Sequence, residues 1–409
     1  MRLAVVSPFL DRRHGTERCI VEQLERFAEQ PEVEIHLYCQ SVEDIAGVIR
    51  YSGPSSCGRI LWHKVSAVPG PHLVGYVWWF LANHIRRWWD TRIGGLKFDL
   101  VYTPGINVLD ADVISVHIVF HEFLFQVRSH LNFRDSPIAS WPRLFHRRLY
   151  YGLIMTLERM VYRRRTTSLT AISHLVSMQL ENYFRRTDAV MIGYGVDTTR
   201  FAPTLRLARR SSTREQFRIS SEDFTLLLIG NDWKKKGLVA LLNALAACRE
   251  LPLLLLVVGT DDQMPYEALI RTSGISDRVH FLDPSSDVLQ FYAAADAYVG
   301  PSLEDAYALP ILEAMACGLP VVASSRAGVS EIITHRKNGL ILFNPQDGAE
   351  LAELLRELCS SPGFCERIGR EAAITAGQQT WDSNAAAVWD LLNQAATKKR
   401  RSTVRQESC

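Results

Sequence analysis

Short apolar runs that alternate with helix-length segments constrain the fold of this 409-residue chain more than any other feature. Leu3–Val6 and Val33–Tyr38 are typical of buried strands, and Ile20, Leu24 and Phe27 between them recur at the spacing of one helix face. The same alternation returns after residue 220. The later strand-like runs are Leu226–Ile229, Leu253–Val258, Val279–Leu282, Tyr298–Gly300 and Pro320–Ala323. Strands that alternate with helices predict parallel sheets covered by helices, so we expect an α/β fold.

Length and local composition predict two domains, because 409 residues exceed a typical single domain. Arg, Ser and Thr dominate residues 203–221, where apolar periodicity stops, so we expect a linker there. It would separate an N-terminal domain of residues 1–202 from a C-terminal domain of residues 222–378. We expect residues 379–397 to form a helix that returns to the N-terminal domain, and residues 398–409 to be a disordered basic tail.

Charge and cysteine content argue against several classes of protein. A net charge of +2 argues against general nucleic-acid binding. The eight cysteines include no C-x-x-C pair and no zinc-like spacing with histidine, which favours reduced thiols in a cytosolic protein. The apolar start is too short for a signal peptide, and no run approaches the roughly 18 uncharged apolar residues of a membrane span. We therefore expect a cytoplasmic protein that meets any membrane at its inner face.

The most informative segment surrounds Asp305 and Glu313. A strand ends at Gly300, a loop carries Asp305, Pro310 opens a helix, and Gly318 closes it. The helix N-terminus offers N–H groups and a positive dipole end to a phosphate. Glu313, expected on the first turn of this helix, needs a partner in its apolar surroundings and suits the hydroxyls of a ribose, whereas Asp305 could reach a sugar. Either acid alone could be a helix-start or surface carboxylate. Two acids, one on the loop and one on the helix that follows it, favour a binding site.

The segment from Asp305 to Glu313 resembles the E-x7-E segment of family-4 retaining glycosyltransferases, the group 1 glycosyl transferases. The resemblance runs over nearly the whole chain. It implies the GT-B fold, in which the parallel sheets of two Rossmann-like domains face a central cleft, the N-terminal domain binding the acceptor and the C-terminal domain the nucleotide sugar. It also implies that Glu313 holds the ribose and that Asp305 contacts the donor sugar. The chain departs from the family in having Asp305 where Glu is usual, and Ala306 and Ala308 where glycines are usual. Ala306, Tyr307, Ala308 and Leu309 are further expected donor contacts.

A lysine-rich loop, Ile229 to Leu238, resembles the family's strand-to-helix loop that supplies an Arg and a Lys to the diphosphate. Lys236 matches the Lys, and Asn231 stands where Arg is common. Lys234 or Lys235 could supply the missing charge, as a point charge without the fork of arginine. The alternative is a solvated helix start, although cations at a helix N-terminus are disfavoured without an anion. Gly259, at the end of a strand, fits a position beside the nucleotide or is a simple turn.

Two further candidates lie in the N-terminal half. Gly15 matches a glycine-rich loop that closes over the donor phosphate, with His14 replacing a neighbouring glycine, while Thr16 could be the helix N-cap. His117 ends a strand of residues 112–117 and matches a family histidine near the reacting sugar, with His121 as the alternative. Without the resemblance, a histidine at a strand end is more often structural.

Tryptophan, tyrosine and arginine are interleaved in residues 76–89 and again in residues 141–151. This mixture suits an interfacial membrane surface, because aromatic rings sit at headgroup depth and cations meet anionic lipids. It equally suits a core helix with snorkelling arginines. Both interpretations stay open.

The resemblance implies a retaining glycosyltransferase that moves a sugar from a nucleoside-diphosphate sugar to an acceptor, with a lipid-linked glycan or cell-envelope polysaccharide as the expected class. His117, Asp305 and Lys236 are the expected catalytic residues. No Asp-x-Asp motif lies between the expected strands, so we expect no obligatory metal and no cofactor beyond the co-substrate. The alternatives are a nucleotide-sugar 2-epimerase of the same fold and a degenerate nucleotide-sugar-binding scaffold.

Overall fold

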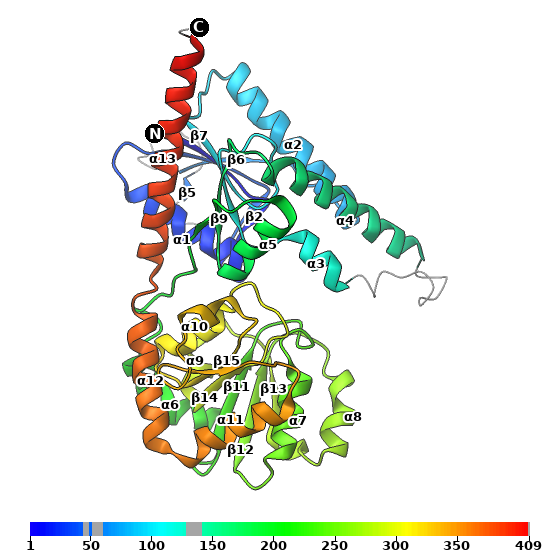
Figure 1. Cartoon of the computed structure of the whole chain (residues 1–409), viewed down its shortest axis with the longest axis vertical. Helices are drawn as coiled ribbons and strands as arrows, with labels where there is room; N and C mark the ends of the chain where they lie inside the picture. Colours follow the sequence, from blue (N-terminus) through cyan, green and yellow to red (C-terminus); the bar gives the residue numbers. More distant parts are fainter. Residues whose placement is uncertain (44–48, 51–59, 128–140, 408–409) are drawn as a thin grey trace. The chain divides into compact units, whose positions relative to one another are not determined.

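The computed structural model describes residues 1–43, 49–50, 60–127 and 141–407. The chain divides into two compact units, and each is an α/β body (Figure 1). The first unit comprises Met1–Ile192 and Trp381–Cys409, and the second comprises Gly193–Thr380.

A parallel sheet forms the centre of the first unit. Among the described residues its strand order is β10(Val190–Met191), β9(Ser168–Ala171), β8(Val113–Val116), β7(Leu100–Pro104), β1(Arg2–Val6), β3(Glu34–Cys39), β6(Ile60–Lys64) and β5(Ile49–Arg50). A short pair, β2(Phe9–Leu10) and β4(Ser41–Val42), lies outside this sheet. The helices are α1(Gly15–Glu29), α2(His72–Arg92), α3(Phe120–Val127), α4(Trp141–Tyr162), α5(His174–Phe184) and α13(Trp381–Glu407). The parallel strands and intervening helices confirm the α/β prediction.

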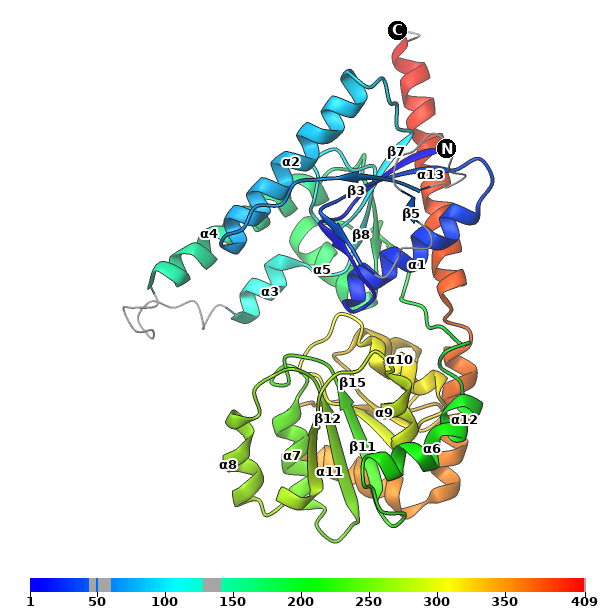
Figure 2. The ribbon, with the colours of Figure 1, turned by 180° about the vertical axis from the view of Figure 1, so that it is seen from behind.

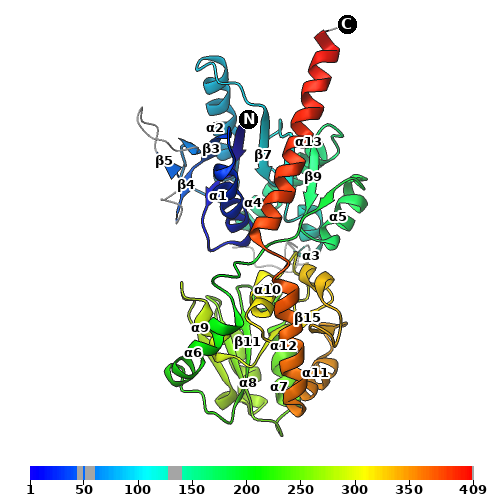
Figure 3. The same ribbon diagram turned by 90° about the vertical axis from the view of Figure 1, so that its left-hand side faces the viewer.

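Helix α13 belongs to the first unit although it ends the chain (Figure 3). Its Val388 and Leu392 are buried in one apolar cluster with strand residues such as Leu3. The ring of Trp389 lies 5.2 Å from that of Phe27 in α1. The last helix thus completes the core of the unit that the first strand begins.

The second unit has a parallel sheet in the order β13(Val279–Leu282), β12(Leu253–Val258), β11(Phe224–Ile229), β14(Ala297–Gly300), β15(Val321–Ser324) and β16(Leu340–Leu342). In chain order this is 3-2-1-4-5-6, the order of a dinucleotide-binding fold, which reverses between β11 and β14. Its helices are α6(Pro203–Gln216), α7(Leu238–Ala247), α8(Met264–Thr272), α9(Leu289–Ala294), α10(Leu309–Ala316), α11(Gly348–Ser360) and α12(Pro362–Ala376) (Figure 2).

The predicted linker of residues 203–221 is wrong. Residues 203–216 form α6, which is part of the second unit, and that unit begins at Gly193. The helix is held by its arginines: Arg210 and Arg214 pair with Asp296 at 2.5 and 3.0 Å, and Arg206 donates to the Cys317 carbonyl at 2.9 Å. Because charged groups rather than an apolar stripe attach α6, the sequence shows no helical periodicity there.

The predicted disordered tail of residues 398–409 is also wrong over its described part, since α13 continues to Glu407. Lys399 pairs with Asp112 at 2.8 Å and Arg400 with Asp99 at 3.3 Å. These ion pairs tie the basic end of the helix to the first unit.

Candidate functional site

The loops that follow β11 and β14 meet where the strand order of the second sheet reverses. The Leu303 N–H donates to the Lys235 carbonyl at 2.7 Å. A Cβ on Gly237, whose φ is +80°, would lie 2.0 Å from the Pro301 carbonyl oxygen, so a larger residue would push the loops apart. In open α/β sheets ligands bind at such a reversal, outside the carboxyl ends of the strands.

An ion pair joins the two loops. Lys236 Nζ lies 2.5 Å from Asp305 Oδ2, and both side chains are about four-fifths buried. The other oxygen, Asp305 Oδ1, accepts hydrogen bonds from the N–H groups of Ala308 at 2.8 Å and Tyr307 at 3.2 Å. Asp305 therefore orders the turn before α10 while Lys236 balances its charge. The sequence predicted both residues as site residues but did not predict that they contact each other.

The turn between Asp305 and α10 has a fixed and unusual backbone. Ala308 has a φ of +67°, in the left-handed region that favours glycine. Tyr307 is buried, and its hydroxyl donates to the Tyr194 carbonyl at 3.1 Å. Leu309 begins the helix, and Ala306 is half-buried in the loop before it. The strained turn holds the N-terminus of α10 beside Lys236 and Asp305.

Glu313 is buried in α10 and has the partner that its surroundings require. Its Oε2 accepts a hydrogen bond from the Tyr292 hydroxyl at 2.7 Å. Burial and the neighbouring Glu313 raise the pKa of Tyr292 well above its usual range, so this hydroxyl stays a donor. Because α10 begins at Leu309, Glu313 lies on the second turn and not on the expected first turn. Tyr292 was not singled out, since a tyrosine among apolar residues is typical of any core.

Asn231 and Gly259 connect the loop after β11 to the loop after β12. Asn231 Oδ1 accepts from the Thr260 N–H at 3.0 Å and lies 3.2 Å from the Thr260 hydroxyl. A Cβ on Gly259 would lie 2.5 Å from the Gly230 carbonyl oxygen. Lys235 Nζ lies 3.6 Å from the Asp232 carboxylate. These contacts give Asn231 and Gly259 roles in loop structure, in addition to any contact with a ligand.

Gly15 is the first residue of α1, and His14 is the N-cap, so the proposal that Thr16 caps this helix is wrong. Asp11 orders the turn: its Oδ1 accepts from the N–H groups of Arg13 at 2.8 Å and His14 at 2.9 Å, and its Oδ2 contacts His14 Nδ1 at 2.7 Å. Burial opposes ionisation of Asp11, but these hydrogen bonds outweigh it and lower the pKa. The spacing of Asp11 before an amphipathic helix was the signal that could have revealed it.

His117 directly follows β8 and is buried. Burial lowers its pKa to about 3, so the imidazole is neutral near pH 7 and acts only through neutral hydrogen bonds. The alternative, His121, contacts the fully buried Glu158 carboxylate through Nδ1 at 2.6 Å. Glu158 also accepts from the N–H groups of Phe120 and His121, which indicates a structural role for this pair.

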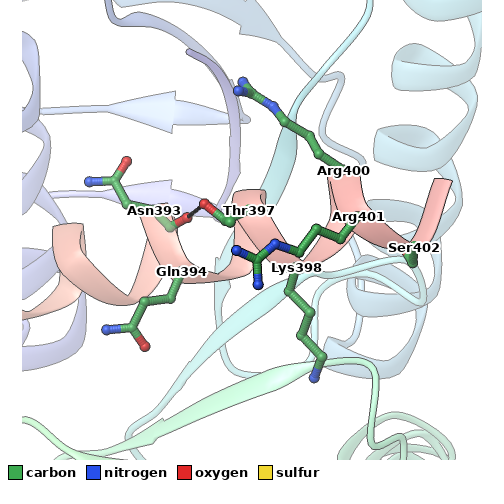
Figure 4. A pocket seen from close by; sticks show the side chains of 7 residues that line it. All are labelled: Asn393, Gln394, Thr397, Lys398, Arg400, Arg401 and Ser402. Atoms are coloured by element: carbon green, nitrogen blue, oxygen red, sulfur yellow. Dashed lines mark hydrogen bonds between the residues drawn. The ribbon is translucent and has the colours of Figure 1, made fainter. Parts of the chain in front are cut away.

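A pocket of ≈ 1000 Å³ lies in the first unit along α13, where Lys398, Arg400 and Arg401 are among its lining residues (Figure 4). In the part of the chain that the structure describes, the residues that line this pocket include none of the predicted site residues. In the described part of the chain, no three His, Cys, Asp or Glu side chains group as they would around a metal ion.

Comparison with known families identifies the second unit. The model for glycosyl transferases group 1 matches residues 209–375. This segment belongs to the group 1 glycosyltransferases. The matched group 1 domain contains all of the candidate residues from Asn231 to Glu313, whereas Gly15 and His117 lie outside it.

Curated relatives match part of the chain. Lipopolysaccharide glucosyltransferase WaaG of Escherichia coli K12 is 33% identical over 157 residues, which cover 37% of this chain and 42% of that protein. The MMP alpha-(1->4)-mannosyltransferase of Mycolicibacterium hassiacum is 32% identical over 274 residues, covering 64% of this chain and 62% of that protein. This chain spans about half the length of the curated relatives that it matches.

Solved structures show the fold of the whole chain. The crystal structure of WaaG has a TM-score of 0.72 at 20% identity, covering 95% of this chain and 99% of that one. Anabaena HepE, solved in complex with UDP and glucose, has a TM-score of 0.69 at 18% identity, covering 96% and 100%. The group 1 domain is thus the C-terminal half of a GT-B fold, which confirms the predicted fold class.

Proposed function

We propose that this protein is a retaining glycosyltransferase that moves a sugar from a nucleoside-diphosphate sugar to a glycan or lipid-linked acceptor. The observation that carries the proposal is the convergence of Lys236, Asp305 and the N-terminus of α10 at the strand-order reversal of a group 1 domain. A cation and a positive helix end at one place are suited to a diphosphate.

The residues of this site suit departure of a nucleoside diphosphate. When the sugar–phosphate bond breaks, negative charge develops on the diphosphate and positive charge on the anomeric carbon. Lys236 and the positive end of the α10 dipole would stabilise the first charge, and Asp305 would orient the sugar. We propose retention of configuration by front-face attack, from the family resemblance. We propose metal independence as well, which activity retained in a chelator would support.

Glu313 is proposed as the ribose ligand. Its carboxylate is held in place by the Tyr292 hydroxyl, so ribose hydroxyls would meet a pre-oriented acceptor. His117, being neutral, is proposed to donate or accept a hydrogen bond near the reacting sugar and not to carry positive charge.

The name of one relative, a lipopolysaccharide glucosyltransferase, supports this acceptor class. The D-inositol 3-phosphate glycosyltransferases and the mannosyltransferase support sugar transfer but not a lipid-linked acceptor. We propose a cytoplasmic protein in peripheral contact with an anionic membrane, where a lipid-linked acceptor would lie. In the described part of the chain, no helix is long and apolar enough to span a bilayer.

A donor panel tests the proposal. The protein is incubated with UDP-, GDP- and ADP-sugars, with and without membrane extract, and released nucleoside diphosphate is measured. Release that depends on the extract and transfers label from the sugar supports a glycosyltransferase. A free epimerised sugar would instead support the 2-epimerase, and binding without turnover would support the scaffold.

A further inference from the structure

Most of the positions that helix α2 buries against the protein are polar. The buried positions are Trp79, Asn83, Arg87 and Asp90. The Arg87 guanidinium makes two hydrogen bonds of 2.8 Å to the Asp110 carboxylate, and Asp90 Oδ2 accepts from the Tyr38 hydroxyl at 2.9 Å. Surface helices of globular proteins usually bury an apolar stripe, so α2 has the opposite polarity.

The outward positions of α2 are apolar and recur at intervals of three and four residues. They are Val74, Val77, Trp78, Leu81, Ile85, Trp88 and Trp89, which we call the α2 apolar face. Leu81 is 54% exposed, Ile85 63% and Trp88 55%. A contiguous exposed patch of this kind marks a surface that contacts something apolar.

The exposed charges of α2 and of its neighbour α4 have one sign, although the exposed Asp110 beside α2 pairs with the buried Arg87. Helix α4 packs beside α2, with Tyr76 and Tyr150 rings 5.8 Å apart (Figures 1 and 2). The acidic residues of the two helices, Asp90 and Glu158, are both buried. The exposed charges on α2 and α4 are therefore basic, from Arg86, Arg92, Arg143, Arg148 and Arg159.

We propose that α2 lies in the headgroup plane of an anionic phospholipid membrane, with the α2 apolar face inserted and the arginines of α2 and α4 paired with lipid phosphates. Exposed tryptophans beside arginines are suited to this interface. A second copy of this chain fits less well, because pairing the two faces would bring basic residues together, and neither α2 nor α4 offers an exposed acid to pair with them. The proposal deepens the membrane contact of the proposed function by naming its surface.

Vesicle flotation of the full-length protein tests the proposal without any donor or acceptor. We expect binding to phosphatidylcholine vesicles that contain phosphatidylglycerol, weaker binding at high salt, and little binding to phosphatidylcholine alone. The double variant Leu81→Glu/Ile85→Glu should bind at least about tenfold more weakly, since it places two carboxylates in the inserted face. Tryptophan emission of the wild type should shift to shorter wavelength on binding, and that of the variant should not.

The matched control is Met264→Glu/Phe343→Glu, which changes two residues that are 70% and 64% exposed in the second unit. It should bind vesicles like the wild type. Unchanged circular dichroism and melting temperature of both variants exclude unfolding as the cause. Equal binding by the Leu81/Ile85 variant, or no binding by the wild type, would overturn the proposal. So would a concentration-dependent dimer that this variant abolishes, because the occupant would then be a second copy. Nucleotide binding, measured separately, reports on the proposed function independently of either result.

Discussion

Lys236 Nζ lies 2.5 Å from Asp305 Oδ2, and the pair joins loops 69 residues apart in the sequence. Asp305 is held by two backbone N–H groups as well. We propose that the lysine exchanges the carboxylate for an anionic ligand when one binds. The pair thus places a cation at the strand-order reversal before any ligand arrives.

Replacing Lys236 by methionine should weaken binding of nucleoside diphosphate about 10- to 100-fold, because a hydrogen bond to a charged group contributes about 1.5–3 kcal/mol. Calorimetric titration with UDP, GDP and ADP measures the effect. Lys234→Met is the matched control, since Lys234 is exposed on the same loop. Equal losses in the two variants would mean that the loop attracts phosphate only by its general charge.

Ala308→Gly should leave the free energy of unfolding unchanged or raise it by up to about 1.5 kcal/mol. Glycine removes the cost of a left-handed alanine, about 1–2 kcal/mol, and adds about 0.5–1 kcal/mol of unfolded-chain entropy. Ala306→Gly, at a residue without positive φ, should instead destabilise the protein. Urea unfolding of both variants tests this. A lower free energy of unfolding for Ala308→Gly would contradict the claim that the backbone of Ala308 is strained.

Gly259→Ala should destabilise the second unit by about 1–3 kcal/mol, because the added methyl meets a backbone oxygen. Gly152→Ala is the control, since a Cβ at that position in α4 has nothing within 4 Å. It should be neutral or stabilising. Thermal unfolding of the two variants distinguishes packing around Gly259 from a general response to alanine.

His117 should make the protein less stable at acid pH. An unfolded histidine titrates near pH 6.5, whereas buried His117 has a pKa of about 3. Between these values the unfolded chain binds a proton that the folded chain does not, so the free energy of unfolding falls by about 1.4 kcal/mol per pH unit as the pH falls. His117→Asn should remove the contribution of this histidine to the pH dependence of the free energy of unfolding. Urea unfolding between pH 7 and about 4 measures that dependence. Identical slopes for wild type and variant would exclude a buried neutral His117.

Regular elements were predictable where apolar burial alone determines them. The expected strand Leu253–Val258 occurs with those bounds, because a run buried on both faces is continuous and apolar. Val279–Leu282 also occurs as expected, although it is an edge strand whose side chains are mostly half-buried. Glu313 was expected to have a partner, and the structure supplies Tyr292.

Contacts between distant polar residues were not predictable. The segment that forms α6 has no apolar periodicity, so it was expected to be a linker. Its arginines attach the helix through Asp296 and backbone carbonyls, and such contacts leave no periodic pattern in the sequence. The Lys236–Asp305 pair depends on the meeting of two loops, which only the sheet order determines. The orientation of the α2 aromatics was left open, because the sequence has aromatics on several faces and only the structure shows that the buried face is polar.

Recognition of ribose by Glu313 tests the donor-site assignment most directly. The affinities of the best-binding ribonucleoside diphosphate and its 2′,3′-dideoxy analogue are measured with wild type, Glu313→Gln and Tyr292→Phe. We predict that the wild type prefers the ribonucleotide at least about tenfold, that Glu313→Gln loses most of this preference, and that Tyr292→Phe weakens it. A wild-type preference that Glu313→Gln leaves unchanged would contradict the assignment of the nucleotide-sugar site to α10.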